Sequence, residues 1–394
     1  MKLLLRILIA IGLGILFGQF LPEGVARIFA TFNAIFSQFL GFCIPLIIIA
    51  FIAPSIGELG KSAGKMLAVT AGLAYLATLG AGFFSYFTSS TLFPRLLGAQ
   101  AVGSLDSVES AGGLQPFFTI DMPPIVGVMT ALILAFVLGF GVAYRETPTL
   151  KRLLGESRDI VSMIITAVII PLLPIYIFGI FLDMTITGEV AAILLTFSKI
   201  IGIIFAMHIV LLLAQYTIAA LFSRHGHNPL RMLWTMLPAY FTALGTQSSA
   251  ATIPVTLRQA KALGVDPDVA GFTIPLCATI HLSGSTLKIV ACAMALMLIK
   301  GQPIDFGSFA GFIAMLGIAM VAAPGVPGGA IMASLGVLSQ FLGFTDADNA
   351  LMIALYISMD SFGTACNVTG DGAITVIVDR FFGRKIASHT EQPR

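Results

Sequence analysis

Long apolar stretches recur along this 394-residue chain, each close to the length that crosses a bilayer as a helix. A helix of about 20 apolar residues spans the hydrocarbon core of a membrane. Eight stretches of 17 to 34 residues come close to that length or exceed it, so the pattern predicts eight transmembrane helices. They cover residues 5–21, 28–53, 66–90, 123–144, 160–183, 189–222, 271–299 and 347–378.

Two further apolar stretches are divided by small residues and predict re-entrant helical hairpins. Residues 233–257 contain LGTQSSAATIPV, and residues 307–343 contain AAPGVPGGAIM. An arm of about 11 residues rises about 16 Å, roughly half the membrane. Proline and glycine at the tip end a helix and free backbone groups that lipid cannot satisfy. The alternative is a kinked span, and for the second stretch length alone supports it nearly as well.

The placement of the basic residues favours the two hairpins. If both stretches are re-entrant, 16 of the 21 Lys and Arg residues fall in cytoplasmic segments, as the positive-inside bias requires. The loop 101–121 then lies outside, and it carries Asp106, Glu109 and Asp121 but no Lys or Arg. We therefore predict a multi-pass protein of the cell membrane, with both termini in the cytoplasm.

The overall composition agrees with a membrane protein. Hydrophobic residues make up 57% of the chain and charged residues 10%, with a mean hydropathy of +0.99. Soluble domains carry roughly 25% charged residues, so a water-soluble globule is excluded. All four cysteines lie in apolar stretches and suggest neither disulfides nor a metal site. We expect no cofactor beyond a coupling ion and no nucleic-acid partner.

Four polar residues recur along the last predicted span. Asp360, Thr364, Asn367 and Asp371 follow one another at steps of four, three and four, which places them on one face of a helix. Polar and charged groups inside a membrane are costly, and they mark the paths of ions and polar solutes. The stripe therefore predicts ligands for something charged or polar.

The seventh predicted span is interrupted at its centre by polar residues, in PLCATIHLSGSTLKIV. An unwound turn there would expose carbonyl oxygens suited to Na⁺. His281 is as well explained by a structural hydrogen bond as by proton transfer. Lys288 lies too deep to reach the membrane surface, so we expect an ion pair with Asp371 or Asp360. A second hypothesis is that its ammonium fills the place of a metal cation.

In order and spacing, these elements resemble the dicarboxylate/amino-acid:cation symporters, the glutamate-transporter family. The resemblance covers nearly the full chain and is strongest in SSAATIPVTLRQAKALGV, FTIPLCATIHLSGS, GVPGGAIM and NVTGD. It implies an all-α integral membrane protein of eight transmembrane helices and two re-entrant hairpins, which forms a homotrimer in lipid and works as an elevator. The implied division is a scaffold of residues 1–64 and 122–188, a transport domain of 65–100 and 189–385, and an extracellular loop of 101–121.

The resemblance also implies roles for individual residues. Asp360 matches the acid that holds the substrate ammonium, Asn367 the amide that holds its α-carboxylate, and Asp371 a Na⁺ ligand. The full substrate set is Ser248, Ser249, Val326, Pro327, Gly328, Asp360, Gly363, Thr364 and Asn367. The cation-binding or coupling set is Tyr75, Thr78, Thr279, His281, Ser283, Ser285, Lys288, Asn367 and Asp371.

Departures from the family pattern bear on substrate and coupling. Gly363 and Gln247 stand where members that carry acidic substrates have arginines, so a second substrate carboxylate would be buried unpaired. A neutral amino acid is therefore expected. The family's NMDGT is replaced by His281–Ser285, so at least one Na⁺ site should be lost. Coupling to fewer Na⁺ ions, to H⁺ through His281, or to neither remains open.

The expected function is secondary active symport of an amino acid, coupled to Na⁺ or H⁺. One alternative is a carrier of dicarboxylates or acidic amino acids with unusual coupling, and another is an anion-leak channel without coupled transport. An enzyme is not expected. Ser283 or Ser285 with His281 could suggest a hydrolase, but they share one turn and no oxyanion motif is evident.

Overall fold

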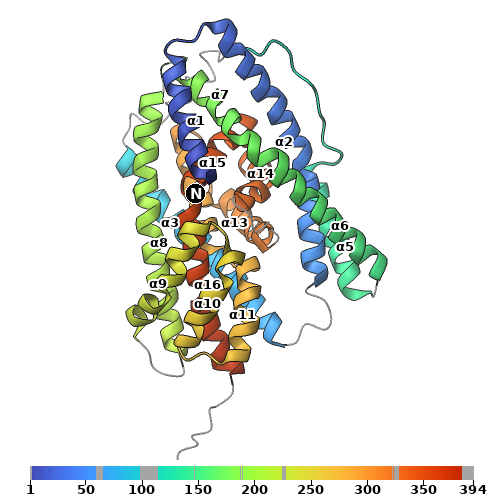
Figure 1. The fold of residues 1–394 in the computed structure, drawn as a ribbon, viewed down its shortest axis with the longest axis vertical. Coiled ribbons are helices and arrows are strands. Elements are labelled where there is room, and N and C mark those ends of the chain that lie inside the picture. Colours follow the sequence, from blue (N-terminus) through green and yellow to red (C-terminus); the bar gives the residue numbers. More distant parts are fainter. Residues whose placement is uncertain are drawn as a thin grey trace, which may run out of the picture.

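The computed structural model describes residues 2–58, 65–97, 114–145, 147–186, 188, 190–223, 228–321, 323 and 328–383, and every regular element among them is a helix (Figure 1). The first half of the chain forms α1 (Lys2–Gly18), α2 (Glu23–Glu58), α3 (Lys65–Leu97), α5 (Val128–Tyr144), α6 (Pro148–Ile164), the π-helical turn η1 (Ile165–Ile169), α7 (Ile170–Ile186) and α8 (Val190–Phe222). The second half forms α9 (Pro229–Thr246), α10 (Ser249–Ala262), α11 (Pro267–Ile280), α12 (Ser283–Ile299), α13 (Phe306–Val321), α14 (Gly329–Leu342), α15 (Asp346–Ser358) and α16 (Asp360–Phe382).

Each of the eight predicted spans coincides with helix. Within the described ranges, five helices are long and apolar enough to cross a membrane, or six if α15 and α16 form one bent span. α1 has 17 residues, as many as the first predicted span, whereas α5, also of 17 residues, begins at Val128, five residues later than the fourth predicted span. The chain is therefore a multi-pass membrane protein, and the exact number of spans stays a prediction.

Two of the predicted spans are broken. The seventh divides into α11 and α12 at His281 and Leu282, as its polar residues predicted. The eighth divides at Met359, and α15 and α16 meet at 64°. The span predicted over 347–378 is therefore bent at Met359 rather than straight. No proline or glycine marks this break, so the sequence pattern carried none of the usual signs of one.

Helix–turn–helix pairs occupy both stretches that predicted hairpins. α9 and α10 pack together with only Gln247 and Ser248 between them. Gln247 adopts a left-handed backbone conformation, with φ of 55°, which turns the chain between the two helices. α13 and α14 also pack together, and residues 322 and 324–327 of their connection lie outside the described residues. Whether each pair enters and leaves on one side of a membrane stays a prediction.

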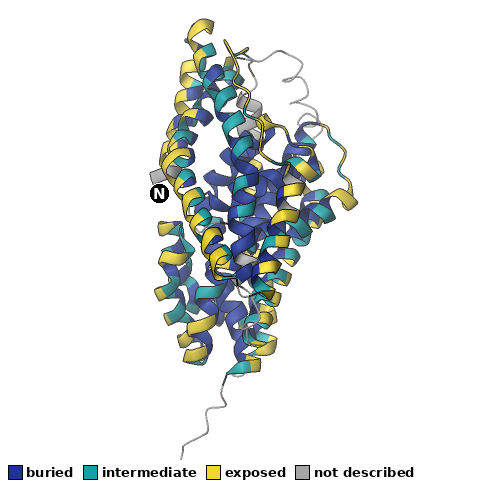
Figure 2. Cartoon of the chain, turned by 90° about the vertical axis from the view of Figure 1, so that its right-hand side faces the viewer, coloured by how far each residue is buried: buried dark blue, intermediate teal, exposed yellow. Residues whose placement is uncertain are grey.

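The helices gather into two sets of neighbours. α2 packs against α5, α6 and α7, while α1 packs along α7. α16 packs against α8 to α12, and α12 also packs along α3 (Figure 1). Every residue of α12 except Leu298 is buried, and Figure 2 shows buried residues concentrated in the central helices. Large apolar side chains such as Leu8, Val137 and Ile209 are exposed on the outside of the protein, as expected for a surface that contacts lipid.

Residues 114–127 run without helix beside α2 and α7. Arg27 donates from Nε to the carbonyl oxygen of Gln115 at 2.9 Å, and Phe117 N donates to Thr31 Oγ1 at 2.9 Å. Leu114 N donates to Asp183 Oδ1 on α7 at 2.9 Å. These bonds hold the described end of the predicted loop 101–121 to the helices. Residues 101–113 lie outside the described ranges, and the extracellular placement of the loop stays a prediction.

A buried ion pair joins the end of α12 to the start of α15 and yields a stability prediction. Lys300 Nζ lies 2.9 and 3.0 Å from the two carboxylate oxygens of Asp348. Lys300→Met leaves that carboxylate buried without its cation, so it should lower the free energy of unfolding by about 3–5 kcal/mol. Thermal melting of the purified protein in detergent measures the effect.

The matched control is Arg152→Met, which removes an ion pair with Glu156 whose side chains are 83% and 57% exposed. Exposed pairs contribute about 0–1 kcal/mol, so melting should change little. Equal shifts in the two variants would contradict the structural role of the Lys300–Asp348 pair.

Candidate functional site

A small polar cavity lies where the helix breaks meet. Its volume is about 30 Å³, enough for one or two water molecules. Four of the residues that line it are Ser249, Ser285, Ala330 and Asp360, which stand in the first turns of α10, α12, α14 and α16. The first turn of a helix has free N–H groups and the positive end of the helix dipole. Four such ends around one cavity favour binding of a carboxylate.

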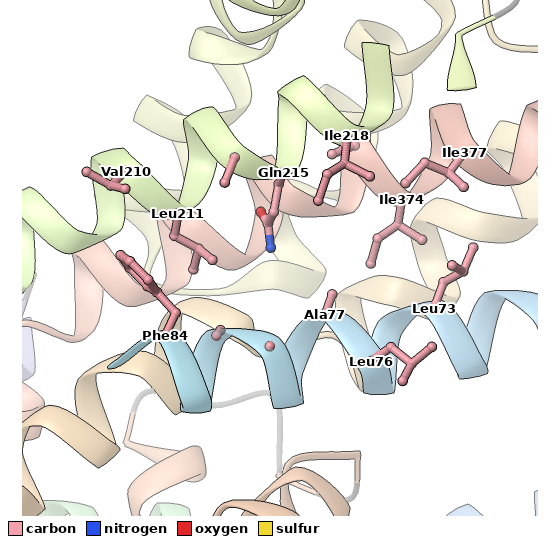
Figure 3. A pocket seen from close by; sticks show the side chains of 14 residues that line it. Leu73, Leu76, Ala77, Phe84, Val210, Leu211, Gln215, Ile218, Ile374 and Ile377 are labelled. Atoms are coloured by element: carbon pink, nitrogen blue, oxygen red, sulfur yellow. The ribbon is translucent and has the colours of Figure 1, made fainter. Parts of the chain in front are cut away.

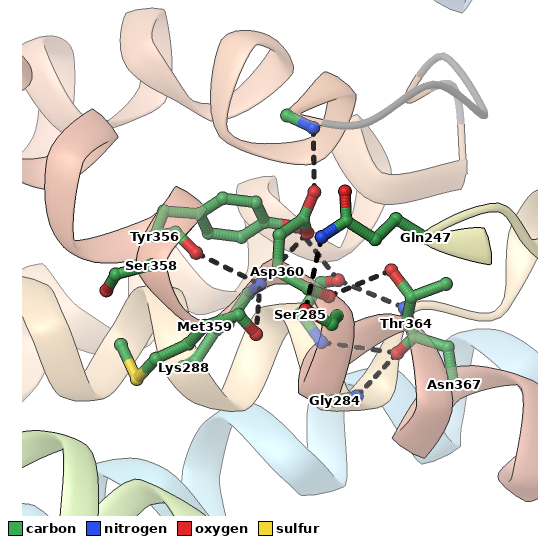
Figure 4. Close-up of polar contacts among 12 residues, drawn as sticks. Gln247, Gly284, Ser285, Lys288, Tyr356, Ser358, Met359, Asp360, Thr364 and Asn367 are labelled. Carbon is green, nitrogen blue, oxygen red and sulfur yellow. Dashed lines mark hydrogen bonds and ion pairs between the residues drawn. The ribbon is translucent and has the colours of Figure 1, made fainter. Parts of the chain in front are cut away.

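Asn367 closes the start of α12. Its Oδ1 accepts hydrogen bonds from the backbone N–H groups of Gly284 at 2.8 Å and Ser285 at 3.2 Å, and its Nδ2 donates to Ser285 Oγ at 3.0 Å (Figure 4). The residue that precedes α12, Leu282, has no side chain that could cap the helix. An amide from α16 therefore supplies the cap, and it also lines the cavity.

Asp360 joins the second hairpin to α12. Its Oδ2 accepts from the backbone N–H of Gly328 at 2.8 Å, and its Oδ1 lies 3.1 Å from Lys288 Nζ. Gly328 has φ of +77°, a left-handed conformation that glycine adopts without strain, and it precedes α14 directly. The expected ion pair of Lys288 is thus confirmed, with Asp360 as the partner (Figure 4). The carboxylate predicted to hold a substrate ammonium already has a cation beside it.

A second buried pair lies deeper along α16. His281 Nδ1 is 2.9 Å from Asp371 Oδ1, and both side chains are at most 2% exposed. Next to it, Gln215 Nε2 donates to Ser283 Oγ at 3.0 Å. Among the described residues, neither His281 Nε2 nor Gln215 Oε1 has a hydrogen-bond partner. One carboxylate oxygen of Asp371, the expected Na⁺ ligand, is therefore hydrogen-bonded to the His281 imidazole. Two polar atoms without partners in the described part of the chain, His281 Nε2 and Gln215 Oε1, lie close to this pair.

Gly370 explains how these groups fit together. A Cβ atom at this position would come within 2.7 Å of both Gln215 Oε1 and His281 Cε1. Real Cβ atoms do not approach other atoms so closely, so any larger residue would push the histidine or the glutamine aside. The glycine in NVTGD thus makes room for the polar cluster.

The remaining predicted substrate residues lie in four different environments or outside the described ranges. Ser248 Oγ accepts from Ala251 N at 3.3 Å and caps α10, while Ser249 lines the cavity. Thr364 lines the cavity and donates from Oγ1 to the carbonyl of Asp360 at 3.0 Å. Gly363 packs on Lys288, where a Cβ would lie 2.8 Å from Nζ. Val326 and Pro327 lie outside the described residues.

Three predicted cation ligands bond to backbone carbonyls instead. Tyr75 OH donates to Ala314 O on α13 at 3.3 Å, and Thr78 Oγ1 donates to Ala74 O at 2.8 Å. Thr279 Oγ1 donates to Leu276 O at 2.7 Å, although the residue also lines the cavity. Their roles in cation binding stay predictions, as do the roles of the other predicted residues.

Sequence reasoning did not identify three side chains that belong to the same network. Tyr356 OH donates to Ser285 Oγ at 3.1 Å, and Ser361 Oγ accepts at 3.2 Å from Nε2 of Gln247, the residue that the sequence had already indicated. Gln215 is the third. A lone amide in the apolar run LLLAQ is a signal that could have found Gln215. Tyr356 precedes Asp360 by four residues, but the break at Met359 removes it from the helical face of the stripe.

A larger pocket between α3, α8 and α16 is of a different kind. It has a volume of about 400 Å³, and its walls include Leu73, Phe84, Leu211 and Ile218. Figure 3 shows the Gln215 side chain reaching into it from α8, the one polar side chain among the described residues that line it. Such walls suit hydrocarbon and offer little to the charged groups of an amino acid.

Broken helices whose ends surround a buried polar cavity are typical of the binding sites of membrane transporters. Comparison of sequences supports this class. The sequence profile of the Sodium:dicarboxylate symporter family matches residues 3–381, and the chain belongs to that family.

Two relatives carry more specific names. The serine/threonine transporter SstT of Streptococcus suis is 27% identical over 340 residues, covering 84% of this chain and 93% of its own. The serine/threonine transporter SstT of Acinetobacter baumannii is also 27% identical, over 394 residues that cover 96% of this chain and 95% of its own. The two alignments thus cover most of this chain and more than nine-tenths of each relative.

The cap of α12 gives a prediction for the site. Asn367→Leu removes the acceptor of two buried N–H groups, and each buried donor left without a partner costs about 1–3 kcal/mol. Thermal melting should show a loss of about 2–6 kcal/mol in the free energy of unfolding. Thr364→Val is the control, because it removes only a bond to the carbonyl of the same helix. A smaller loss for Asn367→Leu than for Thr364→Val would refute the capping role.

Proposed function

We propose that this protein is a secondary symporter that carries a small neutral amino acid across the cell membrane. The observation that carries the proposal is the cavity at which four helix N-termini meet beside the Asp360 carboxylate. The N-termini suit the α-carboxylate of an amino acid, and Asp360 suits its ammonium group. One compact cavity thus offers complementary partners for both charged groups that every amino acid has.

Binding requires the walls of the cavity to move. A space of about 30 Å³ holds water but not an amino acid. Asp360 Oδ2 is bonded to the N–H of Gly328, which leads into α14. When the second hairpin moves away, this oxygen becomes available and the substrate ammonium can replace the Gly328 N–H. Lys288 can keep its place on Oδ1, so the carboxylate has a cationic or N–H partner throughout.

A neutral side chain on the substrate follows from the surrounding charges. Gly363 and Gln247 provide no guanidinium, and the ammonium of Lys288 is paired with Asp360. A second carboxylate in this enclosed place would be uncompensated. The relatives named serine/threonine transporters support the same conclusion, so serine and threonine are the first substrates to test. The dicarboxylate in the family's name makes acidic substrates the alternative.

The proposal includes an elevator mechanism in a homotrimer. α1, α2 and α5 to α7 would form the fixed scaffold, and α3 with α8 to α16 would move with the substrate. The packing of α2 on α5 to α7, and of α16 on α8 to α12, supports this division. Both chain termini would lie in the cytoplasm, because the basic residues concentrate in the segments then placed there.

A cation gradient, of Na⁺ or H⁺, would drive transport. The residues best placed to couple it are Asp371, His281 and Asn367, which connect the α11–α12 break to α16. His281 is hydrogen-bonded to one carboxylate oxygen of Asp371, so fewer carboxylate oxygens are available to bind Na⁺ than in a free carboxylate. The two cations are therefore distinguished by experiment and not by the site alone.

Uptake into proteoliposomes tests the function. Labelled serine should accumulate above its external concentration under an inward gradient of Na⁺ at equal pH, or of H⁺ without Na⁺. Asp360→Asn should lower uptake about 10- to 100-fold, because a hydrogen bond to a charged group contributes about 1.5–3 kcal/mol. Asp305→Asn is the control, since Asp305 is an exposed residue whose carboxylate accepts hydrogen bonds from Ser308 in the first turn of α13.

The outcomes separate the alternatives. Accumulation of aspartate or succinate in preference to serine would support the acidic-substrate reading. Passive equilibration with a substrate-independent anion current would indicate a channel. Uptake by Asp360→Asn at the level of Asp305→Asn would contradict the role given to Asp360.

A further inference from the structure

Lys288 is held in a complete set of ligands inside the protein. Its side chain is 0% exposed, and Nζ lies 3.1 Å from Asp360 Oδ1. The ammonium also donates to the carbonyl oxygens of Tyr356 and Met359, both at 3.4 Å. The Tyr356 ring completes the site, with its centroid 3.3 Å from Nζ. The ammonium is thus surrounded by a carboxylate oxygen, two carbonyl oxygens and the face of an aromatic ring.

These ligands belong to the end of a helix. Tyr356 lies in the last turn of α15, and Met359 is the residue at which α15 and α16 separate. Carbonyl groups at a helix C-terminus carry the negative end of its dipole. Tyr356 O also accepts from Met359 N, and Met359 O accepts from Phe362 N and Gly363 N. A carbonyl oxygen has two lone pairs, so each can meet a cation as well. Two such carbonyls, a carboxylate oxygen and an aromatic face are the donors that a monovalent metal cation would take in the same place.

The absence of a side chain at Gly363 leaves the space that the Lys288 ammonium occupies. A Cβ at this position would lie 2.8 Å from Nζ and 2.9 Å from Cε of Lys288. Because neither distance is tolerated by real side chains, alanine at position 363 would push the ammonium away from Asp360. The chain thus combines the lysine on α12 with a glycine on α16 that lets it reach the end of α15.

Building on the proposed function, we propose that Lys288 is a built-in cation that takes the place of a bound monovalent metal ion at the end of α15. A carboxylate buried in a membrane protein is costly without a positive partner. In a site that depended on a metal ion, Asp360 would lose its partner whenever the ion left. With Lys288, Asp360 stays neutralised in the empty carrier, so the amine of the substrate can bind and leave without a metal ion at this position.

The test asks whether the site accepts a metal ion once the ammonium is gone. Lys288→Met and Lys288→Gln are purified and melted without any amino acid, in NaCl and in an equal concentration of choline chloride. Both variants should melt below the wild type in choline chloride, and NaCl should raise their melting temperatures by several degrees more than it raises that of the wild type. Lys288→Met/Asp360→Asn, which removes both charges, should lose this additional response.

The outcomes decide the proposal independently of transport. A single variant that folds only in NaCl would support it. It is overturned if the single variants respond to NaCl no more than the wild type, or if they fold in neither salt while the double variant folds. Because no amino acid is present, a failure here leaves symport standing, and a failure of serine uptake leaves this result standing.

Discussion

A helix that ends inside a membrane protein leaves backbone groups without partners, and this constraint organises the centre of the structure. The start of α12 is closed by Asn367, and the start of α14 is held by Asp360 through Gly328 N. The carbonyls at the end of α15 are met by Lys288. Each partner comes from another helix, so the breaks are stable only when the helices are assembled.

The same bonds give the protein its chemistry. Helix starts attract a carboxylate and helix ends attract a cation, so a site made of interrupted helices can accept both charged groups of an amino acid. In the structure the N–H groups at the helix starts donate to Asn367 and Asp360, and the carbonyls at the end of α15 accept from Lys288. In the proposed mechanism, substrate binding is an exchange of partners, in which the substrate ammonium replaces the Gly328 N–H at Asp360 while the rest of the network persists.

Periodicity and spacing predicted a large part of this arrangement. The four residues of the stripe all lie on α16, and each stretch that predicted a hairpin is divided between two helices. The break at Met359 was missed because neighbouring helices, rather than a proline or glycine, stabilise it. The choice between Asp360 and Asp371 for Lys288 stayed open because the interruption at His281 obscured the helical phase. Contacts such as Tyr356 with Ser285 depend on tertiary packing that one sequence does not reveal.

The most direct measurement is a structure determined by electron cryomicroscopy with serine bound. The account predicts the ammonium of serine within hydrogen-bond distance of Asp360 Oδ2, in place of the Gly328 N–H, and the carboxylate against the first turns of the surrounding helices. Serine bound elsewhere, with Asp360 Oδ2 still joined to Gly328, would contradict it.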